Sequence, residues 1–184
     1  MISAARFVTL ALLILNAASV APTLTHAAEA PIALRAGDAA PDFDIATTPY
    51  GWRRFSDFWK EREIVLVFEP DDRALVEIER EALALLGNDV SLTVVRRNSD
   101  GANWDALAKL GLSYMLLSDP NGYVAEQFGL AARAGSGIAP GWCLVDRSGV
   151  VRHMAAGAAN EAIAAEITGY VRGVREMAEG SEPR

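Results

Sequence analysis

Cysteine and histidine are both scarce in this sequence. Its 184 residues include one cysteine, Cys143, and two histidines, of which only His153 lies beyond residue 27. A single cysteine forms no internal disulfide, and zinc sites built on several thiolates are excluded with it. A nucleophile–base pair would need His153 together with Cys143 or with a serine. The composition therefore leaves little room for thiol or metal chemistry, and we expect no metal site.

Clusters of lysine and arginine are also missing. The chain carries 17 basic against 24 acidic residues, a formal net charge of −7. Residues 1–27 contain Arg6 as their only charged residue, so the remainder carries 16 basic against 24 acidic residues, a net charge of −8. An acidic chain repels phosphate backbones, and we therefore expect no nucleic-acid partner.

The longest apolar run lies at the N-terminus. A short segment with Arg6 precedes the apolar residues 7–21, and the small residues of Thr-His-Ala follow at 25–27. This layout is typical of a secretory signal peptide, and we expect residues 1–27 to be removed by cleavage after Ala27. The run is shorter than the roughly 20 residues that a membrane-spanning helix needs, so no stable membrane insertion of the mature chain is expected. The protein is predicted to be periplasmic or secreted, and an uncleaved membrane anchor is the alternative.

The rest of the chain alternates between apolar strand patterns and amphipathic helix patterns. Strands are predicted at 64–68, 90–95, 114–117, 142–145 and 150–154, with a small hairpin at 43–45 and 53–55. Helices are predicted at 73–86, 103–110, 121–128 and 159–177. Such alternation predicts an α/β fold in which helices cover both faces of a mixed sheet.

Several short motifs occur in an order that is known from one family. They are GDAAPDF at 37–43, FSDF at 55–58, IVLVFEP at 64–70, LSDPNG at 117–122 and PGWCLVD at 140–146. Together they resemble the redoxins, which include the peroxiredoxins (alkyl hydroperoxide reductase and thiol-specific antioxidant proteins) and the thioredoxin-like thiol reductases. The resemblance runs over residues 35–178 and implies one thioredoxin-like domain with a C-terminal β-hairpin and helix, followed by a flexible tail at 179–184. It implies no cofactor.

The sequence departs from these relatives at the positions that carry their chemistry. Peroxiredoxins have a threonine four residues and a peroxide-attacking cysteine seven residues after the proline that corresponds to Pro70; here these positions hold Ala74 and Glu77. The Cys-x-x-Cys of thiol reductases corresponds to Arg73 through Val76. The reaction needs a thiolate at a helix N-terminus, so the resemblance carries over the fold but not the activity.

A peptide-binding groove is the function that the resemblance still allows. Pro140 matches the cis-proline of thioredoxin folds, whose preceding residue, here Ala139, offers its backbone to an extended peptide. Acidic side chains at the helix start favour a basic segment of a periplasmic protein as partner. The expected binding residues are Pro70, Asp72, Arg73, Glu77, Ala139, Pro140 and Trp142.

Two readings of the single cysteine stay open at this stage. Cys143 is either a buried small hydrophobe or a reactive thiol near the former active site. Trp142 is either part of the core or an exposed anchor of the groove. The chain is accordingly predicted to be a non-catalytic binding module, and the alternative is a thiol-dependent antioxidant enzyme that uses Cys143 or a partner's thiol.

Overall fold

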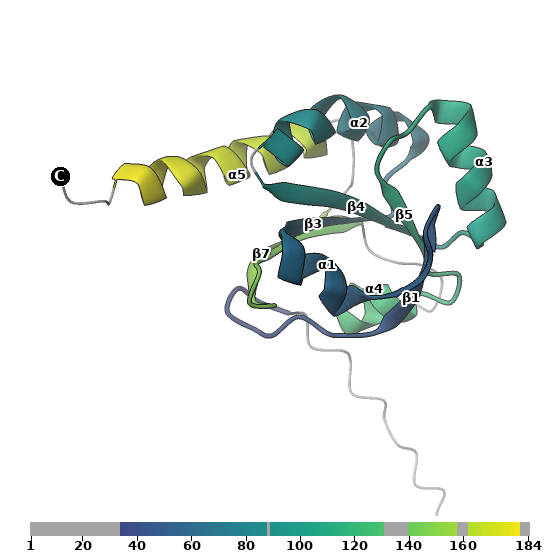
Figure 1. Cartoon of the computed structure of the whole chain (residues 1–184), viewed down its shortest axis with the longest axis horizontal. Coiled ribbons are helices and arrows are strands. Elements are labelled where there is room, and N and C mark those ends of the chain that lie inside the picture. Colours follow the sequence, from purple (N-terminus) through teal and green to yellow (C-terminus); the bar gives the residue numbers. More distant parts are fainter. Residues whose placement is uncertain (1–33, 88, 131–139, 158–161, 181–184) are drawn as a thin grey trace, which may run out of the picture.

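A computed structural model describes residues 34–87, 89–130, 140–157 and 162–180 (Figure 1). The expected signal peptide at 1–27 lies outside these residues. In chain order the elements are β1 (Asp44–Thr48), β2 (Gly51–Arg54), α1 (Phe55–Glu61), β3 (Glu63–Phe68), α2 (Asp72–Gly87), β4 (Val90–Arg96), α3 (Asp100–Leu110), β5 (Met115–Ser118), α4 (Tyr123–Gln127), β6 (Gly141–Val145), β7 (Val151–Ala156) and α5 (Ala162–Gly180).

The strands of the described residues form one mixed sheet in the order β2-β1-β5-β4-β3-β6-β7. The three central strands β5, β4 and β3 run parallel, while the β1–β2 and β6–β7 hairpins pair antiparallel at the two sides. The hairpin β6–β7 and helix α5 end the fold. The predicted α/β architecture, with a mixed sheet and a C-terminal hairpin and helix, is therefore confirmed.

Helices cover both faces of this sheet (Figure 1). On one face α2 and α5 bury their apolar stripes, including Leu75, Ile78 and Ile167, against Val65 and Val67 of β3. On the other face α1 and α4 pack a second core that is rich in aromatic rings, from Phe43, Phe55, Trp59, Phe68 and Phe128. Because both faces are covered, neighbouring residues of β3 and β6 are buried alike, and every residue of β6 is buried.

The two edges of the sheet differ in their surroundings. Beside β7, the backbone of residues 37–39 runs along the strand, where the Gly37 N–H donates to the Val151 carbonyl at 2.8 Å and the Val151 N–H donates to the Asp38 carbonyl at 2.9 Å. At the other edge, β2 is four residues long and fully exposed, and it carries Arg53 and Arg54.

Helix α1 was not predicted from the sequence. It follows β2 directly, its N-cap residue Arg54 makes no side-chain capping bond, and its residues Phe55, Phe58 and Trp59 are types that favour strands. The first turn is instead capped from a distance, since the Ser56 N–H donates to the Asp42 carboxylate at 2.9 Å. The helix forms because Phe55 and Trp59 lie one turn apart and both pack into the second core. The turn before it, between β1 and β2, contains a cis Thr48–Pro49 bond.

The last helix extends further than predicted. Helix α5 continues to Gly180, so that residues 179–180 of the expected tail are helical, and residues 181–184 lie outside the described part of the chain. No helix within the described ranges has the length and apolarity that crossing a bilayer requires.

Candidate functional site

The segment between β3 and α2 is the place where redoxin relatives carry their reactive group. Strand β3 ends at Phe68, and Glu69 turns the chain with a positive φ of 48°. Pro70 is buried. Asp71 then caps α2, since its Oδ1 accepts a hydrogen bond from the Ala74 N–H at 2.7 Å. The Asp71 carboxylate thus satisfies one of the free N–H groups at the start of α2.

The two positions that match the family's threonine and cysteine are occupied by a core residue and by half of an ion pair. Ala74 is fully buried against the core. The Glu77 side chain is 29% exposed and forms an ion pair with Arg80 one turn further along α2. Of the Cys-x-x-Cys positions, Arg73 and Val76 are both exposed. A carboxylate forms no disulfide, so the helix start lacks the thiolate on which the relatives' chemistry depends.

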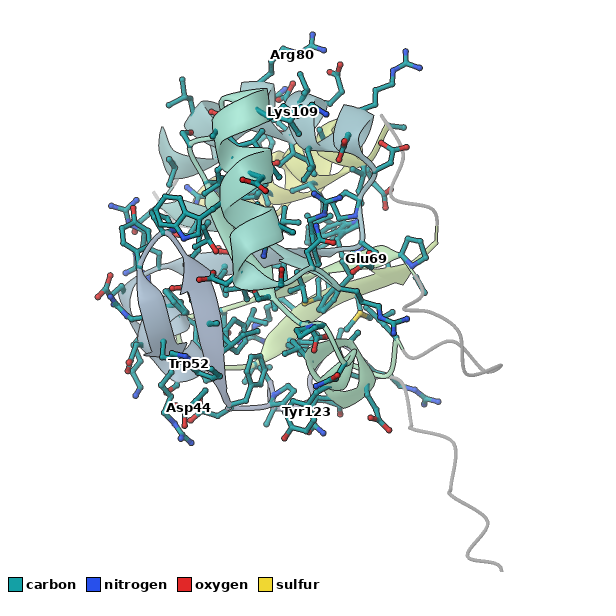
Figure 2. All side chains as sticks on the ribbon, turned by 90° about the vertical axis from the view of Figure 1, so that its right-hand side faces the viewer. Asp44, Trp52, Glu69, Arg80, Lys109 and Tyr123 are labelled. Atoms are coloured by element: carbon teal, nitrogen blue, oxygen red, sulfur yellow. The ribbon has the colours of Figure 1, made fainter. Side chains whose placement is uncertain are left out.

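A network of charges joins the helix start to the end of β4. The Arg96 guanidinium contacts the Asp72 carboxylate at 3.3 Å, and the Arg97 N–H donates to the Glu69 carboxylate. Burial raises the pKa of Glu69, against the lowering effect of this N–H and of the two arginines. Figure 2 shows Glu69 at these strand ends, well separated from Arg80 and Lys109 at the top of the view.

Arg96 is largely buried although it is the last residue of β4. Its side chain is only 15% exposed, and its buried Nε has no hydrogen-bond partner among the described residues. The Asp119 N–H donates to the Arg96 carbonyl at 2.8 Å and so joins the end of β4 to the residue after β5. A strand-end arginine in sequence gives no signal of such a long-range contact.

Cys143 is completely buried in the centre of β6. It lies opposite Leu66 of β3 and Met154 of β7, and its side chain belongs to the core on the α1 and α4 face. Burial strongly raises the pKa of the thiol. A nucleophilic cysteine requires an accessible thiolate, so the interpretation of Cys143 as a small core hydrophobe fits and that of a reactive thiol does not.

Trp142 is a core residue as well, so its predicted place at the rim of a groove is wrong. It is 1% exposed, and its ring stacks on His153 at a centroid distance of 4.3 Å. Its indole N–H donates to the Glu166 carboxylate of α5 at 3.2 Å. Trp142 and Cys143 point to opposite faces of β6, and both faces are covered by helices. The side chain therefore anchors α5 to the sheet.

The proline loop is only partly described. Pro140 is half-buried, and its carbonyl accepts a hydrogen bond from the Gly157 N–H at 2.8 Å. Ala139 and the Ala139–Pro140 bond, for which we expect the cis form, lie outside the described residues. Within the described ranges, no three His, Cys, Asp or Glu side chains are grouped so as to hold a metal ion.

The predicted site is thus only partly assembled in the structure. The structure brings Pro70, Asp72 and Arg73 together at the start of α2. Arg96 and Glu69 lie beside them as partners that the sequence did not reveal. It places Glu77 one turn further along the helix and removes Trp142 from the surface. What remains is an exposed, mixed-charge edge at the carboxyl ends of β3 and β4.

Comparison with known proteins agrees with this geometry. Residues 36–154, more than half of the chain, match the model of the AhpC/TSA family. No curated protein sequence matches the chain with significance.

Solved structures with a similar fold are peroxiredoxins. A mutant PrxQ from Xylella fastidiosa superposes with a TM-score of 0.71 at 15% identity, covering 77% of this chain and 98% of that one. Peroxidoxin BcpB from Mycobacterium tuberculosis gives 0.69 at 20% identity over 77% and 98%. AhpC from Enterococcus faecalis gives 0.67 at 18% identity over 81% and 97%. The chain therefore belongs to the AhpC/TSA family and has its thioredoxin-like fold, with a helix start that carries no cysteine.

Proposed function

We propose that this protein is an exported, non-catalytic binding module that has kept the redoxin fold without its thiol chemistry. The observation that carries the proposal is the pair of residues Ala74 and Glu77 at the family's reactive positions, together with the burial of Cys143. Export is supported by the signal-peptide layout of residues 1–27. The alternative of an enzyme that uses Cys143 requires a thiolate in the middle of a packed sheet, which is the least favourable place for one.

The absence of peroxidase activity tests the catalytic half of this proposal. The mature chain from residue 28, incubated with hydrogen peroxide or an alkyl hydroperoxide and with thioredoxin or dithiothreitol, should consume peroxide no faster than a control without protein. Peroxide consumption and disulfide reduction are the quantities to measure. Turnover that exceeds the control and disappears in Cys143→Ala would contradict the proposal and establish the thiol enzyme instead.

The surface that we propose for binding is the mixed-charge edge formed by Asp72, Arg73, Arg97 and Pro140. The Asp72 side chain is 61% exposed although it contacts Arg96, so it is available to a partner. The chain without residues 1–27 is acidic overall, which favours a basic segment of an exported protein as partner. A partner held by such charges should dissociate as salt is raised.

Matched charge reversals test this surface. Asp72→Lys should reduce the amount of each specifically retained periplasmic protein several-fold. Glu176→Lys is an equal change of charge at an exposed position of α5, whose neighbour Arg175 borders Glu63 at the opposite end of β3, and it should leave retention unchanged. The measurement is quantitative mass spectrometry of periplasmic extract bound to immobilised protein at low and at high salt. Equal losses in both variants would show that net charge, and not the edge, determines retention.

A further inference from the structure

A cavity of about 220 Å³ opens at the end of the sheet that lies opposite the charged edge. It is bordered by the first residues of the three parallel strands, among them Ile64 of β3, Ser91 of β4 and Met115 of β5, and by Leu86 in the last turn of α2. The charged edge lies at the carboxyl ends of the same strands. The cavity and the charged edge therefore lie at opposite ends of the parallel strands.

The register of the sheet explains why this space exists. Strand β5 pairs with β4 only from Thr93 onward, where Thr93 lies opposite Met115. Residues 90–92 of β4 thus extend past the start of β5, and the sheet is stepped at this corner. Side chains from α1, α2 and the β1–β2 turn line the step without filling it.

The walls are apolar and rich in aromatic rings. They include Tyr50, Phe58, Leu86, Leu92, Tyr114 and Met115. Rings and a thioether are the surfaces against which an aromatic ligand packs favourably. The charged member of the lining is Glu61, an exposed residue at the last position of α1, which disfavours an anionic ligand.

One polar group in this lining lacks a partner. Thr93 is 1% exposed, and its Oγ1 forms no hydrogen bond within the part of the chain that the structure describes. Two neighbouring hydroxyl groups are occupied: that of Tyr114 donates to the Leu75 carbonyl at 2.9 Å, and that of Ser113 donates to Glu79 at 2.6 Å. A buried polar group is normally hydrogen-bonded, so an unpaired hydroxyl in a cavity wall points to a ligand that supplies the missing bond.

We propose that this cavity binds a small neutral molecule with one aromatic ring and one hydroxyl group, that is, a phenol or a related aromatic alcohol. A cavity of roughly 150 Å³ with apolar walls holds benzene, so 220 Å³ is enough for a ring with a substituent. The ring packs among Phe58, Tyr114 and Met115, and the hydroxyl group hydrogen-bonds to Thr93 at the inner wall. This inference goes beyond the proposed function and does not depend on it.

Titrations with phenol, toluene and benzoate test the ligand class. Followed in ¹H–¹⁵N spectra of the mature protein, phenol should give saturable shifts at the amides of Thr93 and Met115. Toluene, which has a similar size but no hydrogen-bonding group, should bind about fivefold more weakly, and benzoate should not bind because of its charge. The absence of saturable shifts with phenol, or tighter binding of benzoate than of phenol, would overturn the proposal.

Three variants connect the binding to particular residues. Thr93→Val keeps the shape of the side chain and should weaken phenol binding about fivefold while leaving toluene binding unchanged, because only the hydrogen bond is lost. Leu86→Trp, at the mouth of the cavity, should abolish the binding of both molecules. Leu83→Trp on the same helix, at a 76% exposed position that does not line the cavity, should have no effect. Unchanged phenol binding in Thr93→Val or in Leu86→Trp would place the ligand elsewhere and refute the site.

Discussion

Replacement of Trp142 by alanine is expected to lower the free energy of unfolding by about 3–5 kcal/mol, which is the range for removing a large aromatic side chain from a core. Trp142 is 1% exposed, stacks on His153 and donates its indole N–H to Glu166. The loss should be seen as a lower midpoint in urea or guanidinium unfolding, monitored by circular dichroism. Trp142→Phe keeps most of the ring contacts and should lose about 1 kcal/mol, chiefly through the hydrogen bond.

Trp52 offers a matched control for this experiment. It is 75% exposed on β2, and Trp52→Ala should change the free energy of unfolding by no more than about 0.5 kcal/mol. Similar stabilities of the Trp52 and Trp142 variants would contradict a core position for Trp142. If Trp142→Ala does not fold at all, the intermediate loss expected for Trp142→Phe still decides the question.

Among the carboxyl groups, replacement of Asp146 is expected to have the largest effect on the free energy of unfolding. It lies in the turn between β6 and β7, where its Oδ1 accepts hydrogen bonds from the Ser148 N–H at 2.9 Å, the Ser148 hydroxyl at 2.6 Å and the Val150 N–H at 3.0 Å. Its Oδ2 accepts one from Arg152 Nε at 2.6 Å. Burial alone would raise the pKa of Asp146, but these hydrogen bonds outweigh it and lower the pKa to about 2.

The lowered pKa makes the stability depend on pH in a defined direction. A carboxyl group with a lower pKa in the folded than in the unfolded state stabilises the fold above its unfolded pKa of 3.8, and this contribution is lost as the pH falls towards 2. Asp146→Asn should therefore cost about 2 kcal/mol at pH 7 and progressively less below pH 4. Urea unfolding of both proteins from pH 7 to pH 2 measures the difference.

An exposed aspartate serves as the control for the pH series. The Asp44 side chain is 66% exposed and lies 3.7 Å from Arg54, so Asp44→Asn should remain close to the wild type at every pH. A constant difference between wild type and Asp146→Asn across the whole range would show that lost packing, not the carboxylate's charge, causes the effect.

Much of the fold could be predicted because its signals are local. The apolar run of β3 and the amphipathic period of α2 each follow from a few neighbouring residues, and the observed bounds differ from the predicted ones by at most one residue at each end. Helix α1 could not be predicted in this way. Its aromatic residues favour a strand locally, and only their packing in the second core makes them helical.

The candidate site was less predictable because it depends on contacts between distant segments. The missing cysteines are visible in the sequence, and so is an acidic helix cap at Asp71 or Asp72, of which the structure uses Asp71. The burial of Trp142 is not visible, because in a strand covered on both faces a tryptophan and the cysteine beside it are equally enclosed, and nothing local says which strand is covered. The contact of Arg96 with Asp72 joins residues 24 positions apart and likewise leaves no local pattern.

The two edge strands of the sheet also affect how readily the protein aggregates in a crowded compartment. A long, flat strand with free amide groups invites another chain to pair with it, and this is a common route to aggregation. Here the backbone of residues 37–39 already occupies part of the outer side of β7. The opposite side ends in β2, which is short and presents two arginines to solvent. Both edges of the sheet thus disfavour uncontrolled strand addition, one because it is partly covered and the other because it is short and charged.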